Sequence, residues 1–564
     1  MSLPKSQTTE IPEETRQVAR AAFRKGNVYM RVRDEFGELY RDEHFAELFS
    51  DEGKPAIAAW RLAWVTVLQF AEGLTDRQAA DAVRSRIDWK YVLGLALTDE
   101  GFDYSVLSEY RQRLIAGGRE QVLLERLLEV VQARGLLKPR AQARTDSTQV
   151  LASVRQLNRV EILGETVRQA LNELAEAAPE WVQAWVPADW YRRYGRRFET
   201  IRLPKTKAER DTLMLTIGAD GRTLLAAVYA EAQPAHLRAL ASVERLRRIW
   251  IQQFWTDTEG PGGGQLRLRD SDNQPPGADR LHTPYDEEAR YSAKGAEGWL
   301  GYKVHVTETC DPAEVHLITQ VVTTAATAAD MSTLDQIHAE LKRAGRLPTE
   351  HLLDAGYVDA EALLTAQNEL GIELRSPIRE KVSWQAKADA GYDLAHFSID
   401  WERRQVTCPQ GQVSQHWLER PAGARQAGIQ VRFTRAHCHA CPARQQCTRA
   451  KSGTRVLWFR PQAEHQVLQQ TRQAQNTAAF QARYAQRAGI EGTLSQAIRG
   501  FDLRWARYVG QAKTHLQMLA SAVALNLHRL FDWLMGRPRA RTRLSAFARL
   551  APSPALLAGS WRAA

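Results

Sequence analysis

Residues 299–327 read WLGYKVHVTETCDPAEVHLITQVVTTAAT, and this stretch sets the fold class that the rest of the chain then fits. Two runs rich in Val, Thr and Ile flank the turn-like DPAE, so the stretch predicts two successive strands. A helical pattern follows at 329–345, and residues 351–359, HLLDAGYVD, predict a short apolar strand that ends on an acid. Strand, strand, helix and strand in this order predict a mixed α/β sheet.

A further strand is expected upstream. Residues 141–153, AQARTDSTQVLAS, are β-branched and extended in character, and they predict the first strand of the same sheet. A charged, helical stretch follows from about 154 to 255, and then a Gly- and Pro-rich passage at 259–277. The sheet is therefore expected to be interrupted by a helical insertion and a linker. Downstream, residues 359–378 predict one more helix leading into a short strand.

Residues 40–138 have the pattern of packed helices. The run AAWRLAWVTVLQFAEGL at 58–74 fits a helix with a buried face, and Thr75 is expected to cap the helix after it. The short basic helix, turn and second helix that follow fit a helix-turn-helix DNA-binding unit, but small helical bundles have the same pattern. The many tryptophans of this half are expected to serve packing.

Composition narrows the function classes. The 564 residues carry a net charge of +10 with 44% hydrophobic residues, which is ordinary for a globular protein and favours an anionic partner or a solvated surface. The start has no signal-peptide pattern, and the longest apolar run, near 516–530, is too short and polar to span a bilayer. Five cysteines do not suggest a secreted disulfide framework. We expect a cytoplasmic protein without a membrane partner.

Three acids are placed where chemistry is expected. Asp146 lies in the first predicted strand, Asp354 ends a later one, and Glu491 lies in the helical stretch YAQRAGIEGTLSQAIRG at 484–500. Strand ends of an α/β sheet gather on one edge, so the two aspartates are expected to converge there. A helix packed across that edge would deliver the glutamate.

Each acid also has an ordinary interpretation. Asp146 fits a turn or cap residue, and Asp354 fits a helix N-cap, although Asp359 competes for that position. Glu491 fits a surface acid paired with Arg487, four residues earlier on a helix. If the three acids lie close together in the fold, the shared chemical site is favoured; if they lie apart, the ordinary roles are favoured.

If they meet, they require a cation. Three neighbouring carboxylates resist ionising together, and divalent cations remove that conflict. Mg²⁺ prefers oxygen ligands and keeps room for phosphate oxygens, and two ions about 3.5–4 Å apart can activate one oxygen of a phosphodiester and stabilise the leaving one. Arginines around Glu491 would then hold backbone phosphates through charge-assisted hydrogen bonds.

These motifs carry a resemblance. Tyr, two residues, Arg, three residues and Glu is the spacing of Tyr484, Arg487 and Glu491, and the pattern of acid, small residue and aromatic recurs from Asp354. Together with TDST at Asp146, they resemble the DDE-type transposases of bacterial insertion sequences. The blocks at 285–309 and 489–517 are similar to the insertion-sequence family numbered eleven eighty-two, within the insertion-sequence-four-like superfamily.

The resemblance implies an RNase H-like core and a metal site. Asp146, Asp354 and Glu491 would be the catalytic residues, holding Mg²⁺ or Mn²⁺ for cutting DNA and joining 3′-hydroxyls to a target. The partners would be double-stranded DNA, as terminal inverted repeats and target, and a second copy of the chain in a homodimeric synaptic complex. In the cell such a protein would associate with the nucleoid when bound to DNA.

Four further side chains are candidate DNA contacts, namely Tyr484, Arg487, Arg499 and Lys303. The family's lysine falls at Ile498 in this chain, and Arg499 beside it is the candidate replacement. Lys303 also fits a strand residue whose stem is buried and whose ammonium reaches solvent.

Two rival functions stay open. One is a non-catalytic DNA-binding regulator derived from a transposase, against which an intact set of acids argues, because clustered carboxylates repel phosphate. The other is an RNase H-like nuclease that hydrolyses DNA without strand transfer, and the residues themselves do not separate it from a transposase.

Four of the five cysteines form a separate motif, CPQG … CHACPARQQC. Cys438 and Cys441 have the two-residue gap of thiolate zinc ligands, and Cys408 and Cys447 would complete a tetrahedral structural site. The alternatives are free thiols, or ligation by neighbouring histidines, namely His416, His437 and His439. Cys310 is expected to be a small core residue.

These features predict the following organisation: an N-terminal arm (1–39), a helical DNA-binding domain (40–138), the first core strand (139–153), a helical insertion and linker (154–282), the continued core (283–398), a cysteine-containing insertion (399–455), C-terminal core helices with Glu491 (456–535) and a basic tail (536–564).

Overall fold

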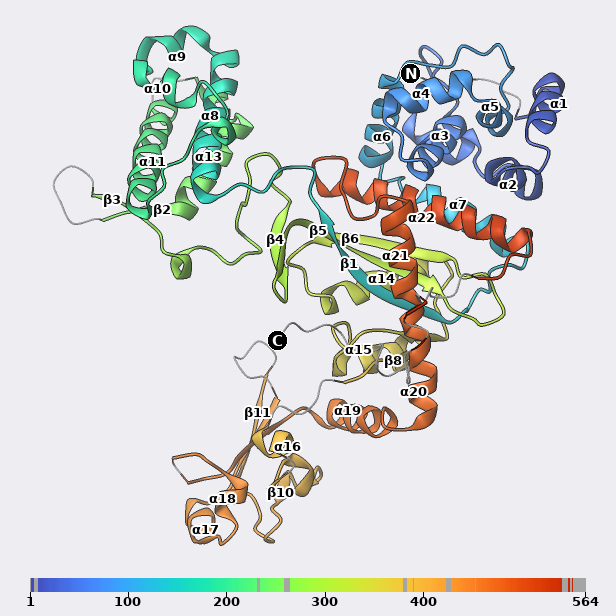
Figure 1. Ribbon diagram of the computed structural model, residues 1–564. Helices are drawn as coiled ribbons and strands as arrows, with labels where there is room; N and C mark the ends of the chain where they lie inside the picture. Colours follow the sequence, from blue (N-terminus) through green and yellow to red (C-terminus); the bar gives the residue numbers. More distant parts are fainter. Residues whose placement is uncertain are drawn as a thin grey trace.

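The computed structural model describes residues 2–4, 9–230, 234–257, 264–378, 383–388, 390–421, 428–451, 453–539, 546–547 and 550. Most of the predicted basic tail, 536–564, and residues 1 and 5–8 of the predicted arm lie outside the described residues. Figure 1 shows a central sheet, a helical group above it, a second helical group at the upper left and a small body at the bottom.

The central sheet has six strands. They are β1 (Ala143–Leu151), β4 (Arg290–Lys294), β5 (Glu297–Thr309), β6 (Ile318–Ala325), β7 (Glu350–Leu352) and β8 (Glu373–Arg375). The order is β4-β5-β1-β7-β8, with β6 also paired to β5. β5 is antiparallel to β1, β4 and β6, whereas β7 is parallel to both β1 and β8. The mixed sheet with its many helices confirms the predicted α/β class.

Helices cover both faces of this sheet. α21 (Gly489–Gly500) lies against β1, and α22 (Gln511–Leu534) lies against β6. α14 (Met331–Arg343) packs on β6 from the opposite face, where a second apolar cluster joins it to α15 (Ala360–Thr365) and its π-helical extension Ala366–Leu370. Two layers of helices therefore bury the sheet, as its apolar strands require.

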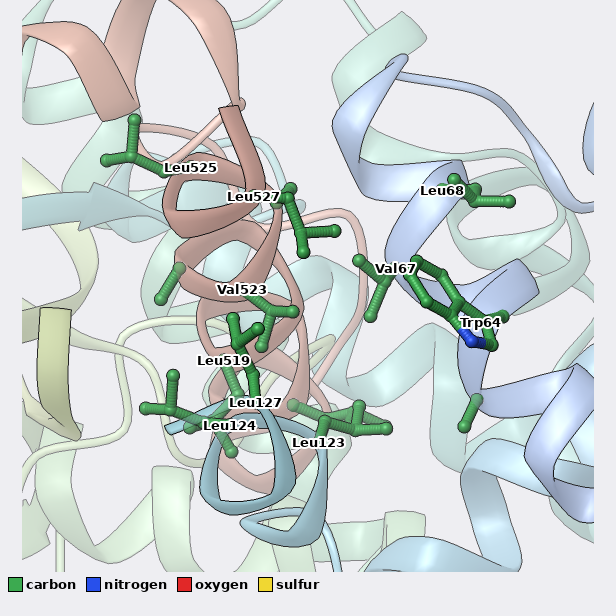
Figure 2. Packing of buried hydrophobic residues seen from close by; sticks show 14 of the residues in the cluster. Trp64, Val67, Leu68, Leu123, Leu124, Leu127, Leu519, Val523, Leu525 and Leu527 are labelled. Atoms are coloured by element: carbon green, nitrogen blue, oxygen red, sulfur yellow. The ribbon is translucent and has the colours of Figure 1, made fainter. Parts of the chain in front are cut away.

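The N-terminal helices share a core with the end of the chain. They are α1 (Glu13–Ala22), α2 (Val28–Phe36), the 3₁₀ helix η1 (Asp42–Leu48), α3 (Ala59–Ala71), α4 (Asp76–Ser85), α5 (Ile87–Leu93), α6 (Ser105–Ala116) and α7 (Val122–Ala133). Figure 2 shows Leu127 of α7 close to Val523 of α22, and Val67 of α3 facing α22 from the other side, in one cluster that continues into the sheet. Thr75 caps α4 as predicted, because its hydroxyl accepts the N–H of Gln78 at 3.3 Å.

The helices between β1 and β5 have a core of their own. They are α8 (Arg159–Ala177), α9 (Pro179–Trp185), α10 (Ala188–Tyr194), the 3₁₀ helix η2 (Phe198–Thr200), α11 (Lys207–Tyr229), α12 (Ala235–Arg238) and α13 (Ala241–Gln253), followed by the hairpin of β2 (Phe254–Thr256) and β3 (Leu266–Leu268) and the 3₁₀ helix η3 (Ser271–Asn273). Their buried apolar side chains form a cluster separate from that of the sheet. Figure 1 shows this group apart from the sheet.

A small body follows β8, and residues 390–459 are called the cysteine module below. Its elements are the 3₁₀ helix η5 (Leu394–His396), β9 (Ser398–Asp400), β10 (Gln405–Thr407), β11 (His416–Arg420), β12 (Gly428–Arg432), α17 (Arg435–Ala440), α18 (Arg444–Cys447) and β13 (Val456–Phe459), preceded by α16 (Trp384–Ala388). The chain then returns to the sheet through α19 (Gln462–Ala474) and α20 (Ala478–Tyr484). Figure 1 places the module at the bottom, away from the sheet.

Two histidines are buried between β1 and α14. His338 Nε2 lies 3.0 Å from His351 Nδ1, and His351 Nε2 lies 2.7 Å from Thr145 Oγ1. Burial lowers the pKa of His338 to about 4, and burial together with the neighbouring His338 lowers the pKa of His351 well below its usual value. Both imidazoles are therefore neutral in the folded protein near neutral pH.

Acid is expected to destabilise the fold through this pair. Protons bind the unfolded histidines near pH 6.5 but the folded ones only near pH 4 or below, so stability is complete above about pH 6.5 and is lost as the pH falls towards 4. At pH 5 the loss is roughly 2 kcal/mol for His338 alone. Urea unfolding at pH 7 and pH 5 measures it. His338→Leu should reduce the pH dependence, whereas the exposed control His236→Ala should not; equal slopes in all three proteins would refute the assignment.

Candidate active site

β1 presents two charged side chains to the helix above it. Side chains two residues apart on a strand point to the same face, so Arg144 and Asp146 both face α21. Asp146 accepts a hydrogen bond from Arg487 Nη2 at 2.9 Å, and Arg144 Nη1 donates to the carbonyl of Gln486 at 2.6 Å. The strand thus places the first predicted acid under the helical segment that carries the third.

The parallel pairing of β1 and β7 brings the second acid alongside. Ala143 is opposite His351 and Arg144 is opposite Leu352, and the same register continued by two residues puts Asp146 beside Asp354. Asp354 lies in a turn after β7, where its carbonyl accepts the N–H of Tyr357 at 3.0 Å. The two aspartates meet because of this register.

Asp359, and not Asp354, is the N-cap residue of helix α15. The Asp359 carboxylate accepts the N–H of Ala362 at 2.9 Å, at the start of α15. Within the described part of the chain, the Asp354 carboxylate accepts one hydrogen bond, from the N–H of the next residue, Ala355, at 2.6 Å, and is 53% exposed. The N-cap interpretation of Asp354 is therefore wrong.

The third acid, Glu491, lies on helix α21, whose first residue packs closely against Arg144 of β1. α20 ends at Tyr484, the 3₁₀ turn η6 (Ala485–Ala488) follows, and α21 starts at Gly489. A Cβ at Gly489 would lie 2.0 Å from Arg144 Nη1, so a larger residue there would displace the Arg144 guanidinium from its contact with Gln486. A 3₁₀ turn therefore precedes the helix that carries the third acid, and α21 holds Glu491 in its first turn, in a helix as predicted.

Asp146, Asp354 and Glu491, called the acidic triad below, meet at the guanidinium of Arg487. Its Nη2 lies 2.9 Å from Asp146 and 3.8 Å from Asp354, and its Nη1 lies 3.8 Å from Glu491. Arg487 is 13% exposed and Glu491 is 70% exposed, so the site is closed on the β1 side and open on the α21 side. Glu491 does pair with Arg487, but within a three-acid cluster instead of an isolated surface pair.

The electrostatics of the cluster follow from burial. Burial raises the pKa of Asp146, and Arg487 and the N–H of Ser147 partly oppose the rise. Burial also raises the pKa of Tyr484, again opposed by Arg487, and the charges of the whole acidic triad act on this phenol. The Tyr484 ring stacks on Phe480 with centroids 5.8 Å apart. Tyr484 thus belongs to the wall of the site.

The donor chemistry of the triad fits a hard divalent cation, because three carboxylates offer anionic oxygens to one point. Among the residues that the structure describes, no group of three or more His, Cys, Asp or Glu side chains is close enough to hold a metal ion. In the triad the reason is visible, since the guanidinium of Arg487 stands between the carboxylates. A cation there and this guanidinium would compete for the same oxygens.

Two predicted DNA contacts lie away from the triad. Arg499 is exposed at the end of α21, eight residues and about 12 Å along the helix from Glu491. Lys303 lies on the α14 side of the sheet, and its ammonium donates to Asp330 at 2.9 Å and to the carbonyl of Ala328 at 2.7 Å. The structure brings Tyr484 and Arg487 to the triad, but not Arg499 or Lys303.

A buried acid that the sequence analysis missed holds the segment in place. Glu308 of β5 is fully buried and accepts from Arg144 Nε, Arg529 Nη1 and Thr493 Oγ1, each at 2.7 Å. Burial alone would raise its pKa, but Arg529 and Arg144 hold it below the usual value. These four residues are called the Glu308 cluster below.

The Glu308 cluster anchors both ends of the segment from Gln486 to Thr493, which carries Arg487 and Glu491. Arg144 donates to the carbonyl of Gln486 at one end, and Thr493 donates to Glu308 at the other. An acid among the apolar residues of VHVTET was the available signal, because a buried strand charge requires partners.

The four motif cysteines line one cavity of the cysteine module, and burial raises the pKa of the Cys447 thiol while Arg455 opposes the rise. None of these four cysteines, and not Cys310 either, is in a disulfide; all five lie in the described part of the chain. Cys310 is buried at the end of β5, and burial raises its pKa to about 12, as fits the predicted core residue.

No helix in the described part of the chain combines the length and apolar character that crossing a bilayer requires.

Two regions of the chain match known protein families. Residues 407–531 match the model described as "Transposase DDE domain", and residues 18–113 match the one described as "Transposase domain (DUF772)". The first region contains Tyr484, Arg487 and Glu491, whereas Asp146 and Asp354 lie outside both. Comparison with curated proteins gives no match, and neither does comparison with solved structures. The two family matches support a DDE transposase, and with it DNA binding.

Proposed function

We propose that the chain is a DNA transposase of the insertion-sequence family numbered eleven eighty-two, which cuts the ends of its element and joins the freed 3′-hydroxyls to target DNA. The observation that carries the proposal is the meeting of Asp146, Asp354 and Glu491 at one guanidinium, in a chain with two transposase matches. These acids come from three distant parts of the sequence, and a protein that only binds DNA gains nothing from gathering carboxylates against phosphate.

The proposal includes an RNase H-like core. Its support is a mixed sheet in which β5 alone runs against its neighbours, with one acid on β1 and another just beyond the adjacent parallel strand β7. The helix that supplies the third acid packs on the same face of β1 as Asp146.

In this proposal the acidic triad would hold Mg²⁺ or Mn²⁺, which when bound activates the attacking oxygen and stabilises the leaving oxygen of a phosphodiester. The chain's own contribution is to gather the ligands on a rigid frame of β1, the turn after β7 and α21. The partly buried position of Asp146 beside a guanidinium keeps one carboxylate oriented before any substrate arrives.

Arg487 is the residue that we expect to change partners. Its Nε is buried and has no hydrogen-bond partner among the described residues. A DNA phosphate beside the triad would offer oxygens to this Nε and to the two terminal nitrogens, in the bidentate geometry that guanidinium favours. Release from the carboxylates and capture of phosphate are then coupled, so the triad becomes accessible as DNA binds.

Replacing Arg487 by Gln is expected to slow strand cleavage about 10²-fold, the usual cost of losing one preorganised donor to a reacting phosphate. Without its guanidinium the pKa of Asp146 rises further, because burial is then less opposed. The ionised carboxylate is required, so activity should disappear at a higher pH on the acid side than in the wild type. Single-turnover rates across pH measure both effects. Arg343→Gln, at the exposed C-terminal end of α14, is the matched control, and equal rates and pH profiles in both variants would contradict the assignment.

DNA as the partner is supported by charge. Residues 391–460 hold eleven Arg and Lys against four Asp and Glu, so this stretch carries +7 of the chain's +10. Such a concentration favours contact with DNA backbone and predicts binding that weakens with salt. We further propose that the N-terminal helices read the terminal inverted repeats, and that a homodimer brings two ends together.

The test is strand cleavage and joining on labelled DNA that carries the element's terminal repeats, with Mg²⁺, with Mn²⁺ and with a chelator. The expected result is metal-dependent cleavage followed by joined products. Cleavage without joining would replace the proposal by the nuclease. Specific binding without any chemistry would replace it by the regulator.

A further inference from the structure

The cysteine module has a cavity that the proposed reaction does not use. It has a volume of about 40 Å³ and is lined by Cys408, Cys438, Cys441 and Cys447. These are four of the five cysteines in the chain, and they come from three separate segments: the turn after β10, the helix α17 with its C-terminal residue, and the end of α18. A volume of this size holds one small ion or a water or two.

One wall of the cavity is the turn at residues 408–412, whose backbone contacts the sulfur of Cys408. The N–H of Gln412 donates to Cys408 Sγ at 3.3 Å, and the N–H of Gly411 donates to the carbonyl of Cys408 at 2.9 Å. Gly411 has φ +77°, a conformation that glycine adopts without strain. This backbone donor holds the Cys408 sulfur at the wall of the cavity.

The module needs a cross-link because its core is small. Among its described residues, the buried apolar side chains of this core are Phe397, Val406, Ile429, Val431, Phe433, Leu457 and Phe459. The strands β9 and β10 have three residues each, and the partly buried Cys408, Cys438 and Cys447 pack on the same core. A core of this size in a body of about 70 residues gives only marginal stability, which small domains raise with disulfides or a metal, and no disulfide joins these cysteines.

We propose that Cys408, Cys438, Cys441 and Cys447 bind one structural Zn²⁺ in this cavity. Four thiolates complete a tetrahedral shell and leave no position for a substrate, so the ion would hold the fold and take no part in phosphoryl transfer. As placed, the described side chains form no group of three close enough to hold an ion, so binding requires the thiols to turn inward about their Cα–Cβ bonds. Two arginines on the cavity wall, Arg444 and Arg455, offset the net negative charge of a four-thiolate site.

Metal analysis of the full chain tests the proposal. Protein purified under reducing conditions without added zinc or chelator should contain about one zinc per chain by plasma mass spectrometry. Cys441→Ser should lose the metal, and Cys310→Ser, which changes the cysteine outside the module, should keep it. His437→Ala tests the neighbouring histidine on the cavity wall, and zinc lost there but retained in Cys441→Ser would overturn the ligand set.

A second measurement does not depend on variants that fold. Titrating wild-type protein with a mercurial that modifies thiols should release the zinc, detected with a colorimetric indicator, and a chelator should lower the thermal stability of the chain. Protein without zinc, whose stability is indifferent to the chelator, would refute the proposal. Neither readout involves strand cleavage, so the zinc site and the proposed transposase activity can fail separately.

Discussion

Replacing Asp354 by Asn is expected to reduce strand cleavage and joining at least about 10³-fold while the protein keeps its fold and its DNA affinity. The side chain is 53% exposed and accepts the N–H of Ala355, a hydrogen bond that an amide oxygen can also accept, so Asn fits without strain. What is lost is one anionic oxygen from the acidic triad, which the proposed metal site requires. Cleavage is measured in single turnover with every protein at the same DNA occupancy.

The same loop provides a matched control. Asp359→Asn makes the same chemical change five residues later, where the carboxylate caps α15 through the N–H of Ala362. Asn caps helices about as well as Asp, so stability and cleavage should both stay near the wild-type values. If Asp354→Asn cleaved as fast as Asp359→Asn, the acid would have no role in the reaction, and the proposed function would lose its central argument.

Much of the fold was predictable because local chemistry determines it. The Val- and Thr-rich runs form β5 and β6, the TDST stretch forms β1, and the charged stretch after it forms α8 to α13. Thr75 caps α4 because the cap and the N–H that it accepts are only three residues apart. Each of these features depends on neighbours within one turn or one strand.

What depends on distant partners was predicted less well. The sequence indicated that Asp146 and Asp354 converge, but the cause, a parallel register between β1 and β7, links positions more than 200 residues apart. The predicted boundaries of the helical DNA-binding domain remain a prediction, and the packing of α3 and α7 on α22 could not be seen in either segment alone. The position of Arg487 inside the triad was also unexpected, because spacing along a helix does not say which way a long side chain turns.

The Glu308 cluster illustrates the limit most clearly. The sequence shows an acid in a buried strand, but not that its partners are Arg144 on β1 and Arg529 and Thr493 on the C-terminal helices. A carboxylate withdrawn from water is tolerated only with matched charges and hydrogen bonds. In this chain the matching groups are the ones that fix the segment from Gln486 to Thr493, and so the direction of Glu491.

Replacing Glu308 by Gln is therefore expected to lower the free energy of unfolding by about 3–5 kcal/mol, because the buried Arg144 and the mostly buried Arg529 then lack an opposite charge. Cleavage should fall as well, since the turn that carries Arg487 loses its hold on β1. Urea unfolding measures the first effect. Single-turnover cleavage, at a temperature where the variant is fully folded, measures the second.

Glu165→Gln separates positioning from general damage. Glu165 is also fully buried and paired, with Arg168 and the Tyr285 hydroxyl, but it lies in α8 among the helices between β1 and β5. Its loss should destabilise that helical group and leave cleavage by folded protein unchanged. Hydrogen exchange should then quicken at residues 486–493 in Glu308→Gln only. If Glu308→Gln cleaved DNA normally and its exchange at residues 486–493 were unchanged, the Glu308 cluster would only stabilise the fold. A residue that positions the acidic triad must alter the segment that carries Arg487 and Glu491.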